Sequence, residues 1–285
     1  MEEAIKKAQV LIEALPYIKN FHKKVVVIKY GGSILAEEKI RRGVLEDIVF
    51  LSFMGIRPVL VHGGGPNISG RMRNKGMKTE FVDGMRVTDK ETLAVVEEEL
   101  KKLNALIVGE ITELGAQAAG LSGKDNKLIQ AAKKRARVDL GLVGHATAVN
   151  TEFLMEALRG GQVVAVIPLA KGDDKKTYNV NADEVASFIA GSLKAEKLVL
   201  LTNVKGIMRR SEDQNSFIST LTTQEAKGLI RDNIIQHGMI PKVNACIDAL
   251  EKGVKKTHII DARIPHALLL EIFTDQGIGT EIVKG

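Results

Sequence analysis

The sequence predicts an α/β fold in which helices cover both faces of a mostly parallel, open sheet. Three short runs, 25–29, 58–62 and 163–167, are rich in Val and Ile and lack polar alternation. Strands that are buried on both faces have this composition. Segments with helical periodicity separate the runs, and such alternation is typical of a parallel sheet. We therefore expect a three-layer αβα sandwich with an extra N-terminal helix.

The extra helix is predicted ahead of the first strand. Residues 4–15 place five apolar side chains on one helical face, namely Ile5, Ala8, Leu11, Ile12 and Leu15. Pro16 is expected to end or kink this helix. The apolar face can be buried in two ways: against the chain's own domain, or against another subunit.

The other elements of the first half follow in chain order. Helices are expected at about 37–54, where Gly55 closes the helix, and at about 66–75. Residues 77–88 look irregular. A long helix should follow at about 89–114, with Thr88 as its N-cap and Glu91 at the capping-box position. Residues 117–150 suit short strands and turns, with hairpin strands at 128–131 and 138–143, and a helix is expected at 151–159.

The second half repeats the alternation after a polar, turn-rich segment at 171–176. Its expected elements are helices at 182–194, 222–235, 241–252 and 265–273, strands at 197–201 and 257–261, and a loop at 202–220. We interpret 171–176 as a join between lobes. The resulting division is 1–20 for an oligomerisation helix, 21–172 for a first lobe and 173–285 for a second lobe.

Composition narrows the class of protein. The 285 residues carry a formal net charge of +6, but the bases are dispersed apart from residues 133–137. Tryptophan is absent and aromatic residues are 4%, so platforms for stacking on nucleic acid are scarce. No apolar run approaches the roughly 18 residues of a membrane span, and the N-terminus does not resemble a signal peptide. The single cysteine, Cys246, fits a reducing cytoplasm and is expected in the core. We expect a cytoplasmic protein that binds neither nucleic acid nor membrane.

Standard nucleotide and metal motifs are absent. Residues 63–70 have Ile68 where the dinucleotide fingerprint needs its third glycine, and Gly123-Lys124 precedes Asp125 instead of Ser or Thr. The six histidines form no H-x-x-x-H pair, so no protein-bound metal is expected.

Two strands instead run directly into glycines. Lys29 precedes Gly31, Gly32 and Ser33, and Gly63-Gly64-Gly65 follow His62 at the end of the second strand. The carboxyl ends of parallel strands bind anions, and glycine lets backbone N–H groups approach them. The plainer interpretations are a surface lysine and an ordinary tight turn. Two such loops favour a site that holds two anionic ligands close together.

Two further segments carry charged side chains at predicted helix starts. Asn179 and Asp183 are four residues apart and can converge on one spot, although an acid in a first helical turn is often only a cap. Lys242 lies where a cation opposes the helix dipole. Such a lysine is better tolerated beside an anion, and the plain alternative is a solvated side chain.

As a set, these motifs resemble the amino acid kinase family over nearly the whole chain, from Val25 to Val283. The segments that carry the resemblance are 28–32, 61–66, 83–88, 179–183 and 238–244. The segment around Arg86 is most similar to the branch that phosphorylates N-acetyl-L-glutamate. The resemblance implies the amino acid kinase fold, and ATP-dependent phosphorylation of the side-chain carboxylate of N-acetyl-L-glutamate in arginine biosynthesis.

The resemblance also implies roles for individual residues. Lys29 and Lys242 neutralise the transferring phosphoryl group, and Asp183 holds both lysines. The acceptor is bound by Gly64, Gly65, Arg86 and Asn179. ATP is bound by Gly31, Gly32, Ser33, Thr202, Lys205 and Gly206, with Mg²⁺ held mainly by its phosphates. Asn203 stands where many relatives have Asp, which leaves any charge-dependent role at that position open.

The charges of the two substrates explain why these roles are needed. The nucleophile is a carboxylate with an ordinary pKa of about 4.3, so it is ionised at neutral pH and needs no general base. The obstacle is repulsion from ATP, about 4 kcal/mol for two like charges 4 Å apart at an effective dielectric constant of about 20. Two lysines and a row of backbone amides offset energies of that size. Asp183 is therefore expected to organise the lysines and not to accept a proton.

The two termini resemble those of arginine-inhibited members of the family. The resemblance implies a ring-shaped hexamer, a trimer of dimers joined through the N-terminal helices, with arginine held near Tyr17, His258, Glu271 and Gly277. A PII-type signalling protein is left open as a partner. Two alternatives remain: another member of the family, such as a carbamate or aspartate kinase, and a catalytically silent arginine sensor.

Overall fold

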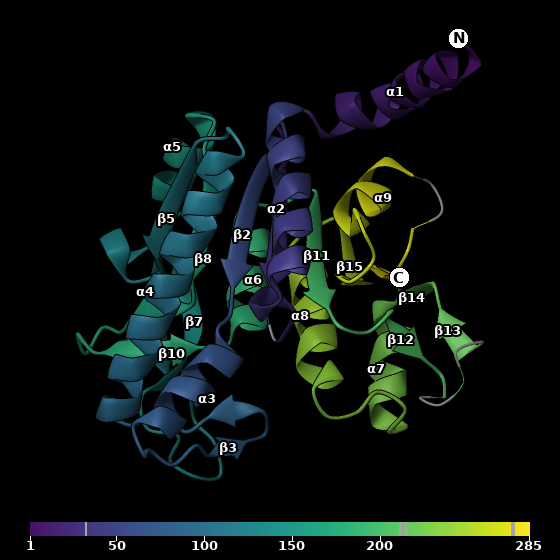
Figure 1. Cartoon of the computed structure of the whole chain (residues 1–285). Helices are drawn as coiled ribbons and strands as arrows, with labels where there is room; N and C mark the ends of the chain where they lie inside the picture. The colour runs from purple at the N-terminus through teal and green to yellow at the C-terminus, as the bar shows by residue number, and fades with distance from the viewer. Residues whose placement is uncertain (32, 211–212, 214–215, 275–276) are drawn as a thin grey trace.

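A computed structural model of the chain describes residues 1–31, 33–210, 213, 216–274 and 277–285. Its centre is an eight-stranded sheet (Figure 1). In spatial order the strands are β14 (Thr220–Thr222), β16 (Thr280–Val283), β15 (Lys256–Asp261), β11 (Lys197–Thr202), β1 (Val25–Tyr30), β2 (Arg57–His62), β8 (Val163–Ile167) and β5 (Ala118–Ser122). Neighbouring strands are parallel except for β15 and β16. The predicted mostly parallel, open sheet is confirmed.

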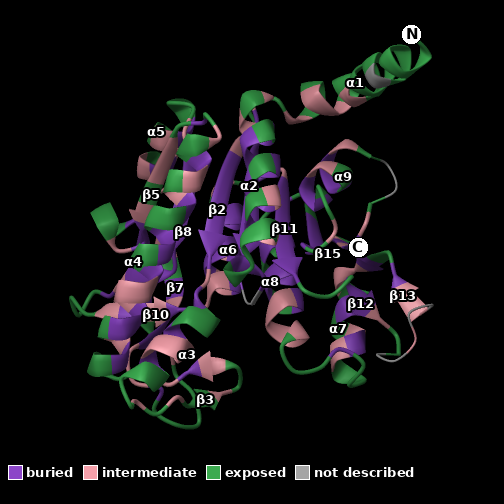
Figure 2. Ribbon diagram, viewed as in Figure 1, coloured by how far each residue is buried: buried purple, intermediate pink, exposed green. Residues whose placement is uncertain are grey.

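Helices cover both faces of this sheet, as predicted. One face carries α2 (Glu38–Phe53), α4 (Lys90–Glu113) and α9 (Ala267–Phe273). The other face carries α5 (Thr151–Arg159), α6 (Ala182–Ser192), α7 (Thr223–Arg231) and α8 (Met239–Glu251). The strands are buried between the two layers (Figure 2). Within β1, Val27 packs with one cluster and Ile28 with the other, because successive side chains point to opposite faces.

Strand register brings three loops to one edge of the sheet. Tyr30 at the end of β1 pairs with His62 of β2 and with Leu201 of β11. The glycine loops after β1 and β2 and the loop after β11 therefore start side by side. Helix α3 (Gly65–Asn74) begins directly in the second glycine loop and packs against α4.

Smaller sheets surround this edge. Strands β6 (Ile129–Lys133), β7 (Val143–Val149), β9 (Leu169–Lys171) and β10 (Thr177–Val180) pair in a closed ring. Two-residue ladders are formed by β3 (Phe81–Val82) with β4 (Met85–Arg86), and by β12 (Ile207–Met208) with β13 (Phe217–Ile218). Short 3-10 turns span Ser33–Ala36 and Asp125–Lys127. The polar segment at 171–176 connects β9 to β10, and the division into lobes stays a prediction.

The N-terminal helix is longer than predicted. Helix α1 spans Glu2–Phe21 and continues through Pro16. Proline removes one backbone hydrogen bond from a helix, and water can replace it because most of α1 is exposed (Figure 2). Four of its apolar side chains, Ile5, Leu11, Ile12 and Leu15, are each more than half exposed. In the described part of the chain, no helix has the length and apolar character needed to cross a membrane.

Several local predictions were wrong. The expected loop at 202–220 contains the short strands β12 and β13, and the helix expected at 222–235 ends at Arg231. The N-cap of α4 is Asp89, which accepts a hydrogen bond from the Thr92 N–H at 2.7 Å, so Glu91 is not at a capping-box position. The Thr88 hydroxyl is buried and donates to the Arg86 carbonyl instead. The second hairpin strand begins at Val143 and not at 138, because residues 138–142 are irregular and Gly141 pairs with Thr88 in an isolated bridge.

Candidate active site

Three charged side chains from three elements meet at the strand edge. Lys29 lies near the end of β1, Asp183 in the first turn of α6 and Lys242 near the start of α8. Lys29 Nζ is 2.9 Å from Asp183 Oδ1, and Lys242 Nζ is 3.0 Å from Asp183 Oδ2. Each carboxylate oxygen therefore binds a different lysine. The predicted trio is brought together, with Asp183 in the middle.

Burial makes this trio electrostatically unusual. Lys29 and Asp183 are 8% and 5% exposed. Burial opposes ionisation of Asp183, but the two lysines outweigh it and hold the pKa of the carboxyl below its usual range. Burial, with a smaller contribution from Lys242, lowers the pKa of Lys29 even though Asp183 acts to raise it. A lowered pKa leaves Asp183 ionised and poorly suited to accept a proton at neutral pH.

A cavity of about 220 Å³ opens on one side of Lys29. It is lined by Gly63, Gly64 and Gly65, and the first turn of α3 begins there. Arg86 and Asn179 line the same cavity, as do Lys29 and Asp183. All the residues predicted to bind the acceptor thus share one cavity. Backbone N–H groups at a helix start and a guanidinium suit an anionic ligand.

Arg86 is a buried cation with neutral partners. It is 6% exposed, and burial lowers the pKa of its guanidinium. Its Nη2 donates to Ser69 Oγ at 2.8 Å and to the Gly65 carbonyl at 3.2 Å. The guanidinium carbon also lies 4.7 Å from the centre of the Phe81 ring. Among the described residues no carboxylate pairs with Arg86, so a bound carboxylate is a suitable counter-ion.

A second, smaller cavity of about 140 Å³ opens on the other side of the trio. It is lined by Lys29, Gly31, Ile34, Leu201, Thr202, Asn203 and Lys242. Lys29 therefore lines both cavities, and Lys242 faces the second. A Cβ atom added to Gly31 would lie 3.0 Å from Lys29 Nζ, so a larger residue there would push the ammonium group from its position.

The remaining residues predicted to bind ATP are less closely placed. Lys205 and Gly206 follow Asn203 along the loop but are not among the residues that line the small cavity. Ser33 begins a 3-10 turn next to it. Gly32 lies outside the described residues. Asn203, whose role was left open, faces the cavity together with Thr202.

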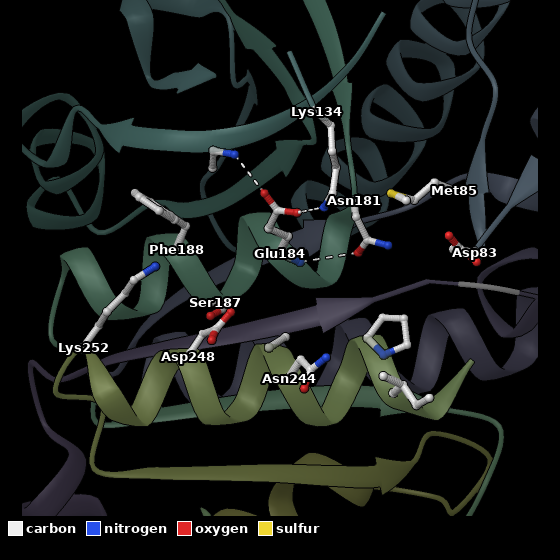
Figure 3. Close-up of a pocket in the computed structure, with 14 residues that line it drawn as sticks. Asp83, Met85, Lys134, Asn181, Glu184, Ser187, Phe188, Asn244, Asp248 and Lys252 are labelled. Atoms are coloured by element: carbon white, nitrogen blue, oxygen red, sulfur yellow. Dashed lines mark hydrogen bonds and ion pairs between the residues drawn. The ribbon is translucent and has the colours of Figure 1, made fainter. Parts of the chain in front are cut away.

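A groove of about 450 Å³ between α6 and α8 runs up to the start of α6 (Figure 3). Asn181 caps α6 by accepting from the Asp183 N–H at 2.8 Å. Glu184 accepts from Lys134 Nζ and from the Ala146 N–H, both at 2.9 Å. These contacts attach the start of α6 to the small strand ring and so fix the position of Asp183.

The four residues predicted to bind arginine lie together far from the trio. A cavity of about 710 Å³ is lined by Tyr17, His258, Glu271 and Gly277. Glu271 is buried, with Oε1 2.7 Å from His258 Nδ1, and its backbone carbonyl accepts from Lys197 Nζ at 3.0 Å. Burial opposes its ionisation, but His258 and Lys197 outweigh burial and lower the pKa of Glu271.

Sequence reasoning missed several residues that line the cavities or hold their side chains in place. Lys197 was taken only as the start of a strand, and its pairing with Glu271 depends on a contact 74 positions away. Ser69 and Phe81 give no signal in the sequence, because their value lies in holding Arg86. Among the described residues, no group of three or more His, Cys, Asp or Glu side chains could hold a metal ion.

Comparison with known proteins finds a matching family model and relatives that are about 50% identical. Residues 24–261 match the model of the amino acid kinase family. The acetylglutamate kinase of Caldanaerobacter subterraneus subsp. tengcongensis is 50% identical over 283 residues, covering 99% of this chain and 95% of that protein. The acetylglutamate kinase of Desulforamulus reducens is 47% identical over 286 residues, covering 100% of both.

Solved structures with a similar fold include a related enzyme with bound ligands. N-acetylglutamate synthase from Neisseria gonorrhoeae, complexed with coenzyme A and N-acetyl-glutamate, is similar with a TM-score of 0.87 and 28% identity, over 98% of this chain and 63% of that longer one. Its complex with coenzyme A and L-arginine has a TM-score of 0.82 at the same identity and covers 65% of that chain.

Proposed function

We propose, because the chain belongs to the amino acid kinase family, that it transfers the γ-phosphoryl group of ATP to the side-chain carboxylate of N-acetyl-L-glutamate. The chain is a kinase with a carboxyl group as acceptor, and relatives about 50% identical carry the name acetylglutamate kinase. The observation that carries the proposal is the position of Lys29, a buried cation that lines two adjacent cavities. One cavity suits the acceptor, and the other suits the phosphates of ATP.

The acceptor is bound as a dianion in the cavity that contains Arg86. The Arg86 guanidinium faces the α-carboxylate, and Asn179, whose side chain donates to Thr88 Oγ1 at 3.3 Å, contacts the amino-acid portion. The N–H groups of Gly64 and Gly65 meet the reacting carboxylate at the start of α3. This arrangement orients the nucleophile toward Lys29, and orientation is a large part of catalysis in reactions of this kind.

ATP is bound with its γ-phosphate between Lys29 and Lys242. Gly31, Ser33 and Thr202 contact the phosphates, and Lys205 and Gly206 belong to the same nucleotide-binding loop. Mg²⁺ is held mainly by ATP and neutralises phosphate charge when bound. Asp183 keeps both lysines aimed at the transferring group. Since positioning and electrostatics dominate phosphoryl transfer, the reaction needs no proton acceptor.

One assay tests this function. ADP formation is measured with N-acetyl-L-glutamate, with unacetylated glutamate, with carbamate and with aspartate. We expect turnover with the first acceptor alone, because apolar residues such as Ile68, Leu100 and Val143 also line the cavity that contains Arg86 and suit an uncharged acetamide better than a free ammonium group. Turnover with carbamate or aspartate would instead support another member of the family, and no turnover with any acceptor would support a silent arginine sensor.

Arginine inhibition and a hexameric assembly form a second part of the proposal. Tyr17 on α1 lines the same cavity as His258, Glu271 and Gly277, so the N-terminal helix and the C-terminal region are physically linked. The similar synthase was solved with L-arginine. The exposed apolar face of α1 suits pairing with a second α1, and three such contacts close dimers into a ring. The protein is proposed to act in the cytoplasm, with a PII-type protein left open as a partner.

Deleting residues 1–16 tests this second part. Sizing by light scattering should show the hexamer replaced by dimers, and arginine should lose its effect on turnover. A truncated protein that keeps both its size and its arginine response would contradict the proposal without affecting the kinase assignment.

A further inference from the structure

A buried chain of hydrogen bonds lies behind the glycine loop of the acceptor cavity. Asn104 on α4 has its Nδ2 atom 3.1 Å from the Ala165 carbonyl and 3.0 Å from His62 Nε2. His62 Nδ1 is 3.3 Å from the Gly63 carbonyl. His62 is 0% exposed and Asn104 is 8% exposed. The chain therefore links two backbone carbonyls through two side chains, away from water.

The two carbonyls determine where the protons are. A carbonyl only accepts, so the Asn104 atom that faces Ala165 must be the amide nitrogen. That nitrogen only donates, so His62 Nε2 must be unprotonated. The ring proton then lies on Nδ1, which donates to the Gly63 carbonyl. Burial lowers the pKa of His62 to about 4, and a second ring proton would face the Asn104 amide hydrogens.

Fixing the Gly63 carbonyl also fixes the next N–H group. The peptide bond is planar and trans, so the Gly64 N–H points away from the Gly63 C=O. Gly63 itself donates to the Tyr30 carbonyl at 3.0 Å. The loop is therefore held on both sides of Gly63, at a sequence of three glycines that would otherwise have wide conformational freedom.

The surroundings of Asn104 are shaped for this amide. A Cβ atom added to Gly120 on β5 would collide with Asn104 Oδ1, so a larger residue there would displace the amide. In the described part of the chain, no carboxylate pairs with the His62 ring, whose environment consists of buried neutral groups.

We propose that His62 and Asn104 are positioning residues for phosphoryl transfer: the Nδ1–H form of His62, imposed by Asn104, aims the Gly64 N–H at the reacting carboxylate of the acceptor. This inference rests on the proposed function of the cavity. It explains why a histidine precedes the three glycines, although neither side chain lines the cavity itself. Tautomer and turnover are separate observables, so the inference and the proposed function can fail independently.

Histidine ¹⁵N NMR of the full-length protein tests the tautomer without any assay. Signals are assigned with His62→Asn. We expect a neutral His62 ring with the proton on Nδ1 from pH 6 to 8. A ring protonated on Nε2 or on both nitrogens in this range would overturn the inference, whichever substrate the enzyme uses.

Asn104→Asp tests the link to catalysis through pH. The new carboxylate only accepts, so a neutral His62 must move its proton to Nε2 and lose its bond to Gly63. At lower pH an imidazolium paired with the carboxylate carries both protons and restores that bond. We expect kcat/KM for the acceptor to fall at least tenfold at pH 8.5 and to recover as the pH is lowered to 6. KM for ATP should stay within about twofold of the parent value.

Two matched variants separate positioning from core stability. Asn104→Leu should show a smaller deficit that does not depend on pH between 6 and 8.5, because leucine offers Nε2 no acceptor and His62 can keep its Nδ1 proton on the Gly63 carbonyl. His62→Asn keeps a donor next to the main chain and should retain more activity than His62→Leu. If Asn104→Asp and Asn104→Leu have the same flat pH profile, or if KM for both substrates changes in parallel with melting temperature, the two residues serve the core alone and the inference is wrong.

Discussion

Replacing Asp183 with Asn tests the electrostatic design of the trio. The substitution keeps the shape of the side chain and removes the charge between Lys29 and Lys242. At 2.9 and 3.0 Å, each ion pair is worth about 6 kcal/mol of Coulomb energy at an effective dielectric constant of about 20. Much of this is offset by the cost of burying the charges, and breaking buried pairs typically costs about 3–5 kcal/mol. We expect the free energy of unfolding to fall by about that amount.

The effect on catalysis should carry a pH signature. If about 3 kcal/mol of transition-state stabilisation is lost, kcat falls about 100-fold. Asp183 also acts to raise the pKa of Lys29 against the effect of burial, so its loss should move the alkaline limb of the pH–rate profile to lower pH. The exposed Asp173→Asn, in the turn between β9 and β10, is the matched control and should change neither quantity. If the alkaline limb stays in place and an acid limb near neutral pH disappears instead, Asp183 is a proton acceptor and the reasoning fails.

Four further expectations follow from the same structure. The pKa of Asp183 is lowered in the folded state, so its stabilising contribution is fully present above its unfolded pKa of about 3.9 and is lost as the pH falls through the folded value. The free energies of unfolding of the parent and of Asp183→Asn should therefore converge only in acid, which denaturant titrations at several pH values measure. Gly31→Ala should lower kcat about tenfold, because the added methyl group lies 3.0 Å from Lys29 Nζ and displaces it. The control Gly43→Ala in α2 meets nothing within 4 Å and should stabilise the helix by about 0.5–1 kcal/mol. Equal kcat values for the two variants would contradict this. Glu271→Gln should remove arginine inhibition while leaving turnover without arginine unchanged, and an unaltered inhibition curve would exclude Glu271 from the effector site. Burial raises the pKa of the Cys246 thiol to about 12, so iodoacetamide at pH 8 should leave the folded protein unmodified as judged by mass spectrometry, and rapid alkylation would contradict the buried position.

The central strands were predictable because their signal is local. Runs such as 25–29 and 163–167 are apolar on both faces, and each became a fully buried strand. Strand β5 was not placed in the main sheet, because four of the five residues of Ala118–Ser122 are small. It is a strand only through its pairing with β8. The N-cap of α4 was missed for a similar reason, since Thr88 and Asp89 both suit a cap and a tertiary contact of Thr88 decides between them.

The candidate site was partly predictable from residue types. Lys29, Asp183 and Lys242 were expected to act together, and the resemblance to the family already implied that Asp183 holds both lysines. The structure adds how this happens, since α6 lies beside β1, α8 packs against α6, and the three side chains are brought together. The partners of Arg86 and the chain from Asn104 to Gly63 join residues far apart in sequence. Sequence pattern identifies the charged groups, whereas the neutral groups that hold them in place become visible only in the fold.

The most direct test of the account is a crystal structure with N-acetyl-L-glutamate and a non-hydrolysable ATP analogue. The account predicts the γ-phosphate within hydrogen-bond distance of both Lys29 and Lys242, with the acceptor in the cavity that contains Arg86 and its reacting carboxylate on the Gly64 N–H. Ligands bound elsewhere, or lysine side chains turned away from the phosphate toward water, would contradict it.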